Sequence, residues 1–575
     1  MFVNWKPFLT SVLLFFPIAF ASAATNPESA ISSDAGIVIR LKQPKLTQQN
    51  ITGLLNQVDE TLSGVLSGSL RTFLGRSISN PALAGVDTSR DLYVGVYLSQ
   101  ANQPGLLYVI PVSDQKAVQE ALGEGYHSAV HEKWIVYSED QKLVDQAGTL
   151  LKSREKNFSS QMTASSRDLF ADGDLSVYVN SKKLVQVYQP QLVLAGQKID
   201  QTLNQLSATV NTAPGVNVKP MMAMYSAVAK GALQAVQDSQ SYTTAVKVTP
   251  AGLGVESLFE VKANSVTDLL FQANQPQGFA QLGKFPANQL TYFAGAGNTD
   301  ALITWGMNFT AQMFDETEQN AEAKAQFESI VKEIRSLKFG SYYFSFELGK
   351  LSEGVLNAYT ISEVSPSEEM RKYTRQMMSL MKNISLPGMQ QQVTMTPDAE
   401  KIGDVTVDLT VIKQEINPES DPLQIQKRML EVLYGPSGIT NRMAYPEGKV
   451  LQAMGATASM KKFLEALDAP DNSKQLAQNQ PAFEAAREEG LSKANLLALI
   501  DVPTTVLKIY NILAESQQKE GPFSAGLIKK QGISTSYLTF SLSTGKQTLT
   551  TKTYIPVQNM KSGFKVFTIL STQKK

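Results

Sequence analysis

Two distant stretches of the chain, residues 173–188 and residues 493–510, share one pattern of apolar and polar positions. In each, a strand-like apolar run is followed by apolar residues at helical spacing. Asn180 or Ser181 stands between the two parts of the first stretch, and Asp501 stands there in the second. These are residue types that cap helix N-termini. Both stretches are therefore predicted to form a strand, a turn and a helix.

The surroundings of the two stretches have the same order of predicted elements. Each is preceded by a strand and a helix, is followed by a hairpin, and belongs to a half that opens on a strand-plus-helix pattern. The corresponding ranges are 133–151 and 449–467 for the preceding elements, 241–261 and 536–557 for the hairpins, and 36–58 and 288–309 for the openings. We interpret this agreement as an internal duplication with a whole-domain period.

Alternating strands joined by hairpins indicate antiparallel sheets, and the amphipathic helices are expected to cover one face of these sheets. We predict the α+β class, with two tandem related domains that each carry a mostly antiparallel sheet with helices on one face. The first domain is predicted at 24–275 and the second at 286–575. Pro, Gly, Gln and Asn gather in residues 273–289, where we place the connection between them.

The N-terminus has the pattern of a secretory signal peptide. Lys6 precedes an apolar run from Phe8 to Phe20, and the small residues Ala21-Ser22-Ala23 follow. The run is shorter than the roughly 20 residues that a spanning helix needs, so cleavage is favoured over an uncleaved anchor. We predict residues 1–23 as the signal peptide and expect no transmembrane segment after its removal. The expected destination is the periplasm, with the cell surface or the medium as alternatives.

The pattern resembles an uncharacterised family of exported bacterial proteins that carry a domain of unknown function. Phe285-Pro286-Ala287 leading into Leu290-Thr291-Tyr292, and the strand at 496–500, carry the resemblance. It implies a fold and an exported location. No catalytic motif comes with it.

Composition narrows the classes of function. Lys plus Arg and Asp plus Glu number 52 each, so the chain lacks the basic footprint of a nucleic-acid-binding protein. Cysteine is absent, which excludes disulfides, thiolate nucleophiles and thiolate metal sites. We therefore expect an exported protein that is held together by packing alone.

Motifs for catalysis fail in their context. His127 and His131 are the only histidines, and no third ligand follows them at metal-binding spacing. Ser153 and Lys156 match a Ser-x-x-Lys pattern, but they lie at a polar helix end or loop, and the Tyr178 that would assist them lies inside a predicted strand. We expect no catalytic, cofactor-binding or metal-binding residues, and no cofactor.

Methionines gather in two places and form the candidate binding surface. Flexible thioethers fill cores by default, but they also line adaptable apolar grooves and can bind Cu(I). The candidate residues for an apolar binding surface are Met221, Met222, Met224, Met377, Met378, Met381 and Met389.

The leading hypothesis is a non-enzymatic envelope protein that binds a protein or an apolar ligand. The alternative is an envelope hydrolase whose Asp, Glu, Ser or Lys residues follow no readable motif.

Overall fold

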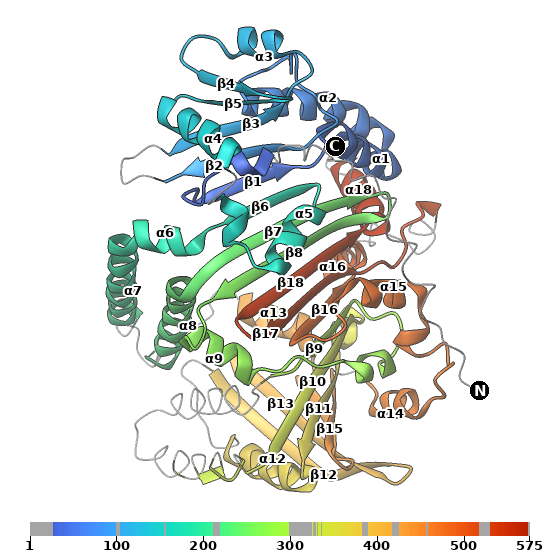
Figure 1. Ribbon diagram of the computed structural model, residues 1–575. Helices are drawn as coiled ribbons and strands as arrows, with labels where there is room; N and C mark the ends of the chain where they lie inside the picture. Colours follow the sequence, from blue (N-terminus) through green and yellow to red (C-terminus); the bar gives the residue numbers. More distant parts are fainter. Residues whose placement is uncertain are drawn as a thin grey trace, which may run out of the picture.

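The computed structural model describes most of the chain (Figure 1). The described residues are 27–98, 104–153, 157–210, 219–297, 325, 329–330, 332–334, 336–381, 389–416, 425–455, 458–516 and 530–572. The predicted signal peptide lies outside them. We call the residues before the 273–289 connection the first half and those after it the second half.

Strands run through both halves. Those of the first half are β1 (Ile37–Leu41), β2 (Leu92–Tyr97), β3 (Gly105–Pro111), β4 (His127–His131), β5 (Trp134–Ser138), β6 (Leu175–Val179), β7 (Ser239–Thr249) and β8 (Gly252–Val261). Those of the second half are β9 (Thr291–Gly295), β10 (Lys338–Leu348), β11 (Leu356–Ser365), β12 (Met389–Ile402), β13 (Val405–Ile416), β14 (Ile439–Ala444), β15 (Lys449–Met454), β16 (Leu496–Ile500), β17 (Leu538–Gly545) and β18 (Thr548–Pro556).

Helices alternate with these strands. In the first half they are α1 (Pro44–Val58), α2 (Glu60–Ser77), α3 (Gln115–Leu122), α4 (Gln141–Ser153), α5 (Ala164–Asp172), α6 (Ser181–Val187), α7 (Gln189–Val210), α8 (Lys219–Asp238) and α9 (Val266–Ala273). In the second half they are α12 (Ser367–Met381), α13 (Ile425–Tyr434), α14 (Met460–Asp468), α15 (Pro481–Glu489), α16 (Val502–Ser516) and α18 (Val557–Thr572). Short 3₁₀ helices are η1 (Pro27–Ala30), η2 (Phe158–Gln161), η3 (Ala280–Lys284), η4 (Leu351–Glu353) and η5 (Ala477–Asn479).

The strands of each half pair in a definite spatial order. The first half has the order β4-β5-β3-β2-β1-β6-β7-β8. The second half has the order β12-β13-β14-β15-β11-β10-β9-β16-β17-β18. Without the β12–β13 hairpin, the two orders correspond strand for strand, with β1 matching β9 and β8 matching β18.

A final pairing joins the halves into one sheet. Strand β8 pairs antiparallel with β18 along nine residue pairs, from Gly252 opposite Pro556 to Glu260 opposite Thr548. The described residues thus form an 18-stranded sheet in which every strand pairing is antiparallel. It runs from β4 at one edge to β12 at the other (Figure 1).

The α+β class and the large antiparallel sheet are as predicted, but the prediction of helices on only one face is wrong. Strand β3 sends Leu107 and Val109 into a core with residues of α4 and α5, and its Tyr108 and Ile110 into a second core with residues of α3. Five consecutive positions of this strand are buried. Such a strand needs a cover on both faces.

The second half is covered on both faces in the same way. On strand β15, Ala453 packs with Phe463 of α14 and Phe483 of α15. Val450, on the other face, packs with Tyr373 of α12. The connection at 273–289 is likewise packed rather than loose, and it contributes three residues that are at most 2% exposed to the second-half core: Phe279, Leu282 and Phe285.

The two capped helices predicted from the repeated pattern are present, and their caps correspond. The side chains of Asn180 and Asp501 each accept a hydrogen bond from the amide three residues later, at 3.1 and 3.2 Å. The backbone amides of the same residues donate to the carbonyls of Gly36 and Leu290, at 2.8 and 2.9 Å. Each cap thereby ties its helix to the entrance of the neighbouring strand, β1 or β9.

We predict that Asp501→Asn stabilises the protein at neutral pH. Burial raises the pKa of Asp501 above its ordinary 3.8, although hydrogen bonds from Thr504 and Ser536 offset part of that effect. The folded state therefore favours the neutral acid, and the charged form costs stability once the pH exceeds the raised pKa. Asparagine keeps the capping acceptor without the charge, as Asn180 does in the first half.

The measurement is thermal unfolding of wild type and Asp501→Asn between pH 4 and pH 8. The stability gain should be largest at pH 7 and should shrink as the pH falls. Asn180→Ala and Asp501→Ala, which lose the cap, should each cost about 1 kcal/mol. A destabilised Asp501→Asn protein at pH 7 contradicts the argument.

Candidate functional site

The structure places the candidate methionines on three separate elements. Met221, Met222 and Met224 lie near the start of α8, whereas Met377, Met378 and Met381 lie on α12 and Met389 opens β12. Helix α8 packs on α7 and α9, and α12 packs on β11, β12 and β15. The two groups of methionines therefore belong to different surroundings, one in each half. The side chains of Met221, Met222, Met224, Met381 and Met389 lie outside the described residues.

Of the candidates with described side chains, Met377 is a core residue. It packs, partly buried, against the cluster that contains Ile334, Val364 and Tyr373. Met378 next to it is half-buried. This side of α12 fills the interior, which is the default role of methionine.

An exposed apolar surface does exist near α8, and other residues form it. The side chains of Val266, Leu269 and Leu270 on α9 are 66%, 57% and 59% exposed, and those of Val228 and Val236 on α8 are 66% and 45% exposed. Spacings of three and four residues place Val266, Leu269 and Leu270 on one face of α9. Helices α8 and α9 pack together (Figure 1). We call these five residues the α8–α9 apolar stripe.

Helix α9 differs from an ordinary surface helix, because polar residues lie on its buried side and leucines on its exposed side. Its buried positions include the polar Thr267 and Asp268, at 5% and 1% exposure. The backbone amide and hydroxyl of Thr267 both donate to Oδ2 of Asp238, the last residue of α8, at 3.1 and 2.7 Å. These bonds hold the polar side of α9 inward and leave its leucines in solvent.

Asp268 ties the same helix to the second half. Its Oδ1 accepts a hydrogen bond from the amide of Gln547 at 2.9 Å, and its Oδ2 accepts one from the amide of Asn264 at 2.7 Å. Gln547 lies in the turn between β17 and β18. The orientation of the stripe therefore depends on backbone groups from both halves.

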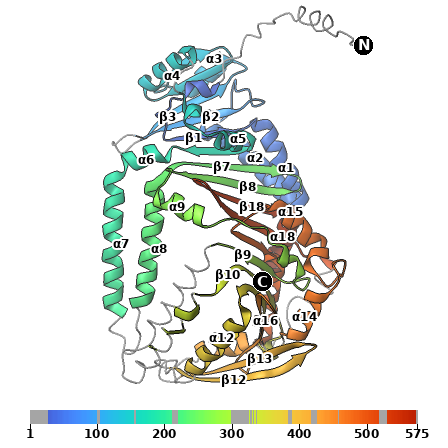
Figure 2. The same ribbon diagram turned by 60° about the horizontal axis from the view of Figure 1, so that its bottom comes forward.

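Further exposed apolar residues lie on the long helical hairpin of α7 and α8. Helices α7 and α8 run side by side along one side of the molecule, with α9 near one end of α8 (Figure 2). Val193 and Leu194 on α7 are also about half exposed, at 49% and 54%. Large exposed apolar patches are unusual on a monomer and mark interaction sites.

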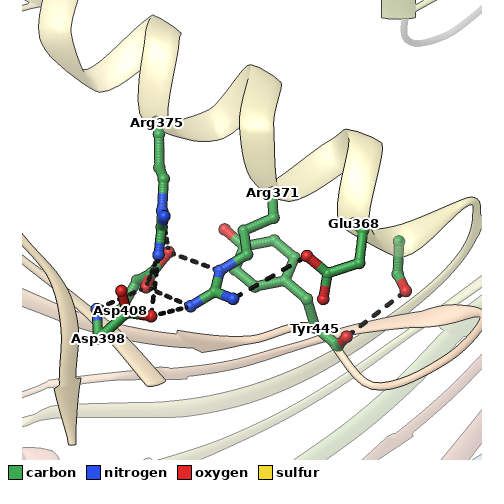
Figure 3. A network of polar contacts seen from close by, with 7 residues as sticks. Glu368, Arg371, Arg375, Asp398, Asp408 and Tyr445 are labelled. Carbon is green, nitrogen blue, oxygen red and sulfur yellow. Dashed lines mark hydrogen bonds and ion pairs between the residues drawn. The ribbon is translucent and has the colours of Figure 1, made fainter. Parts of the chain in front are cut away.

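The strongest polar network lies elsewhere, between α12 and the β12–β13 hairpin (Figure 3). Arg371 and Arg375 of α12 both donate to the carboxylate of Asp408, which is 1% exposed, with the shortest contact at 2.7 Å. Both guanidinium groups also reach Oδ1 of Asp398, at 2.6 and 3.2 Å. The ring of Tyr445 lies against Arg371.

This network is chemically suited to holding the hairpin, not to proton transfer. Burial alone would raise the pKa of Asp408, but the hydrogen bonds from Arg375 and Arg371 outweigh it and hold the pKa well below 3.8. The bond to Asp408 also raises the pKa of Arg375. Asp408, Arg371 and Arg375 therefore keep their charges across the physiological range, and none of the three is poised as a general acid or base.

The described residues of the catalytic motifs considered in the sequence lie on strands, in the core or at a helix end. His127 and His131 lie on strand β4, and in the described ranges no group of three His, Asp or Glu residues could hold a metal ion. Tyr178 is buried in the first-half core, where burial raises its pKa to about 12. Ser153 ends α4, whereas Lys156 lies outside the described residues.

No protein-family model, curated protein or solved structure matches this chain. The geometry of the chain is therefore the basis for any functional argument, and the resemblance to exported proteins stays an expectation. Within the described ranges, no helix combines the length and apolar character needed to cross a bilayer.

We predict that Asp408→Asn lowers the free energy of unfolding by about 3 kcal/mol, because it leaves two partly buried guanidinium groups without their charged partner. The carboxylate has a lower pKa in the folded protein than in the unfolded chain, so its contribution is present above pH 3.8 and is lost as the pH falls further. Denaturant unfolding of both proteins measures the difference.

The matched control is Glu400→Gln on the same hairpin. Glu400 pairs with Arg442 at 2.9 Å but is 36% exposed, so its loss should cost less than about 1 kcal/mol. Equal effects of the two substitutions would show that burial of Asp408 adds nothing.

Proposed function

We propose that this protein is a non-enzymatic, exported binding protein that acts through the α8–α9 apolar stripe. The observation that carries the proposal is the orientation of α9. Its buried side holds the polar Thr267 and Asp268 beside Phe271, and its solvent side carries Val266, Leu269 and Leu270. A helix held this way gains nothing from its own leucines, so the stripe has its use in a contact outside the chain.

The stripe suits an apolar partner. Burying a leucine or valine side chain contributes roughly 1.5–3 kcal/mol, so Val266, Leu269 and Leu270 together can supply several kcal/mol of binding free energy. Aliphatic side chains contribute no directional bonds, which fits the apolar surface of an envelope protein or an apolar ligand. Fixing the helix beforehand through Asp238 and Asp268 lowers the entropy cost of binding.

The export part of the proposal rests on the N-terminal pattern, a charged residue, an apolar run and small residues at 1–23. The periplasm fits a chain that has no cysteine and no helix, within its described part, of membrane-spanning character.

We also propose that the protein consists of two related units that arose by duplication, at 24–275 and 286–575. The matching strand orders support this, and so do matching polar contacts. The amide of Val248 donates to Asp174 at 2.7 Å, and the amide of Thr544 donates to Asn495 at 2.6 Å. In both cases the acceptor side chain precedes the strand, β6 or β16, and receives the bond from the next strand along the sheet.

Further correspondences reach back to the start of each unit. An isolated bridge joins Ser32 to Asn157 in the first half and Pro286 to Leu476 in the second. Ser32 follows the 3₁₀ helix η1 and precedes strand β1. Pro286 likewise follows η3 and precedes β9. These contacts support the duplication and extend the correspondence to η3, which lies just before the start of the second unit at residue 286.

The alternative of an envelope hydrolase finds no comparable support. Asp268, Asp408 and Asp501 are each 1% exposed, and the carboxylate of each is engaged. Asp408 binds Arg371 and Arg375, Asp268 accepts from the amides of Asn264 and Gln547, and Asp501 accepts from the amide of Thr504. The hollow between α1 and α2 is lined by Gln48, Arg71, Thr72 and neutral neighbours, without a carboxylate.

We predict that Leu269→Lys/Leu270→Lys weakens binding by at least about tenfold without lowering thermal stability, since both side chains are exposed and their contact with the partner supplies the free energy. The assays are binding of a fluorescent apolar probe and co-sedimentation of the purified mature protein with membranes and proteins of an envelope extract.

Phe567→Lys on α18 is the matched control, because Phe567 is 68% exposed and lies outside the stripe. Equal losses in control and stripe variants would contradict the proposal. So would turnover of an esterase, peptidase or glycosidase substrate that disappears when a single acidic residue is replaced.

A further inference from the structure

The pairing between β8 and β18 joins corresponding strands of the two halves. Each is the last strand of its half. Strand β8 is the second strand of the β7–β8 hairpin, and β18 is the second strand of the β17–β18 hairpin. The two run antiparallel over the whole paired length. A twofold axis between two copies of one unit produces this arrangement, whereas a head-to-tail contact would pair unlike edges.

The centre of the ladder falls on corresponding residues. Glu256 is the middle of the paired segment of β8, Lys552 is the middle of β18, and the two lie opposite each other. Exchanging the halves turns the pair at one end of the ladder, Gly252 with Pro556, into the pair at the other end, Thr548 with Glu260.

The backbone hydrogen bonds at the two ends of the ladder have the same symmetry. The amide of Val261 donates to the carbonyl of Gln547 at 3.0 Å, and the amide of Val557 donates to the carbonyl of Ala251 at 2.8 Å. Val261 and Val557 each end or follow their strand, and Ala251 and Gln547 each precede it. The ladder is therefore closed by the same bond at both ends.

The helices over the seam also correspond. Helix α5 precedes β6 and packs on β7 and β8, while α15 precedes β16 and packs on β17 and β18. The two sides of the seam thus receive equivalent covers. Lys552 reaches Glu489 at the end of α15, at 3.7 Å.

We propose that the edge of β8 is self-complementary: it fits a second copy of the same edge, and β18 is the copy that fills it within this chain. The protein is in this sense a homodimer of one unit made covalent. The inference rests on the duplication proposed above and is independent of the binding role of the stripe.

Charge at the axis fits this account. Two identical β8 edges would place Glu256 opposite Glu256, and like charges directly opposite one another in a sheet are destabilising. In the present chain, Lys552 stands opposite Glu256 instead. Divergence of the second copy has removed the repulsion that self-pairing would carry.

The first experiment tests the axis in the full-length mature protein, which has no cysteine of its own. Because the end bonds make Ala251 and Val557 a hydrogen-bonded pair, alternation makes Glu256 and Lys552 a non-hydrogen-bonded pair with Cα atoms about 4.5 Å apart. That separation allows a disulfide. Glu256→Cys/Lys552→Cys should form an intrachain disulfide on mild oxidation. Glu256→Cys/Thr550→Cys, one diagonal away, should not.

The second experiment frees the β8 edge. The same alternation directs the amides of Thr551 and Thr553 toward β8, so Thr551→Pro/Thr553→Pro removes two donors from the ladder. With Glu256→Cys added, two chains should associate as concentration rises, and oxidation should link them through the substituted position. Gly254→Cys is the control, because a Cβ there fits without a clash but would not oppose its own copy.

A chain that stays monomeric and uncross-linked while its circular dichroism and cooperative unfolding remain intact overturns the proposal. If those prolines unfold the protein, the mirror variant frees the other edge, with Val255→Pro/Ser257→Pro and Lys552→Cys. If both proline variants unfold, the test is made on the β8–β18 ladder without proline substitutions. Val255→Cys/Thr553→Cys and Ser257→Cys/Thr551→Cys are exchanged by the axis, so both pairs must form disulfides on mild oxidation, and the failure of either pair overturns the inference. None of these readouts depends on ligand binding.

Discussion

The backbone ladder between β8 and β18 is the interaction on which the rest of the structure depends. Without it, each half would end in an exposed strand with a row of unpaired N–H and C=O groups, which is a template for aggregation. With it, the described strands form one sheet, and α18 packs against both β8 and β18. The stability of each half is thereby coupled to the presence of the other.

The same seam positions the surface to which we assign binding. Asp268 on α9 is held by the amide of Gln547, which lies in the turn that begins β18. The apolar side of α9 faces solvent because its polar side is occupied by Asp238 and by this turn. The β17–β18 hairpin therefore both pairs the two halves and holds α9 with its apolar side in solvent. The Arg371–Asp408 network does separate work, since it holds the additional β12–β13 hairpin to α12.

The sequence predicted local structure well because local structure leaves a periodic pattern. The hairpins at 241–261 and 536–557 and the caps at Asn180 and Asp501 are where the pattern places them. Sheet neighbours were harder, since alternation tells which face a strand buries but not which strand lies beside it. The uninterrupted apolar run of residues 106–110 in β3 was the sign in the sequence that helices cover both faces.

The methionine pattern pointed to other residues than the α8–α9 apolar stripe, and this difference has a physical reason. The run Leu269-Leu270-Phe271 has the spacing of an ordinary buried stripe, and only the inward hydrogen bonds of Thr267 and Asp268 show that two of its three residues face solvent. The partners of those bonds, Asp238 and Gln547, are remote in sequence. Methionine content drew the prediction to α8 and α12 instead, where Met377 is a packing residue.

Hydrogen exchange of individual backbone amides tests the central claim most directly. The account predicts that the seam-facing amides of Val261 and Val557, which make corresponding bonds across the ladder, exchange at the same slow rate and only by unfolding of the whole sheet. Fast exchange at one of them, or exchange of both through an opening that leaves the remaining strands protected, would contradict it.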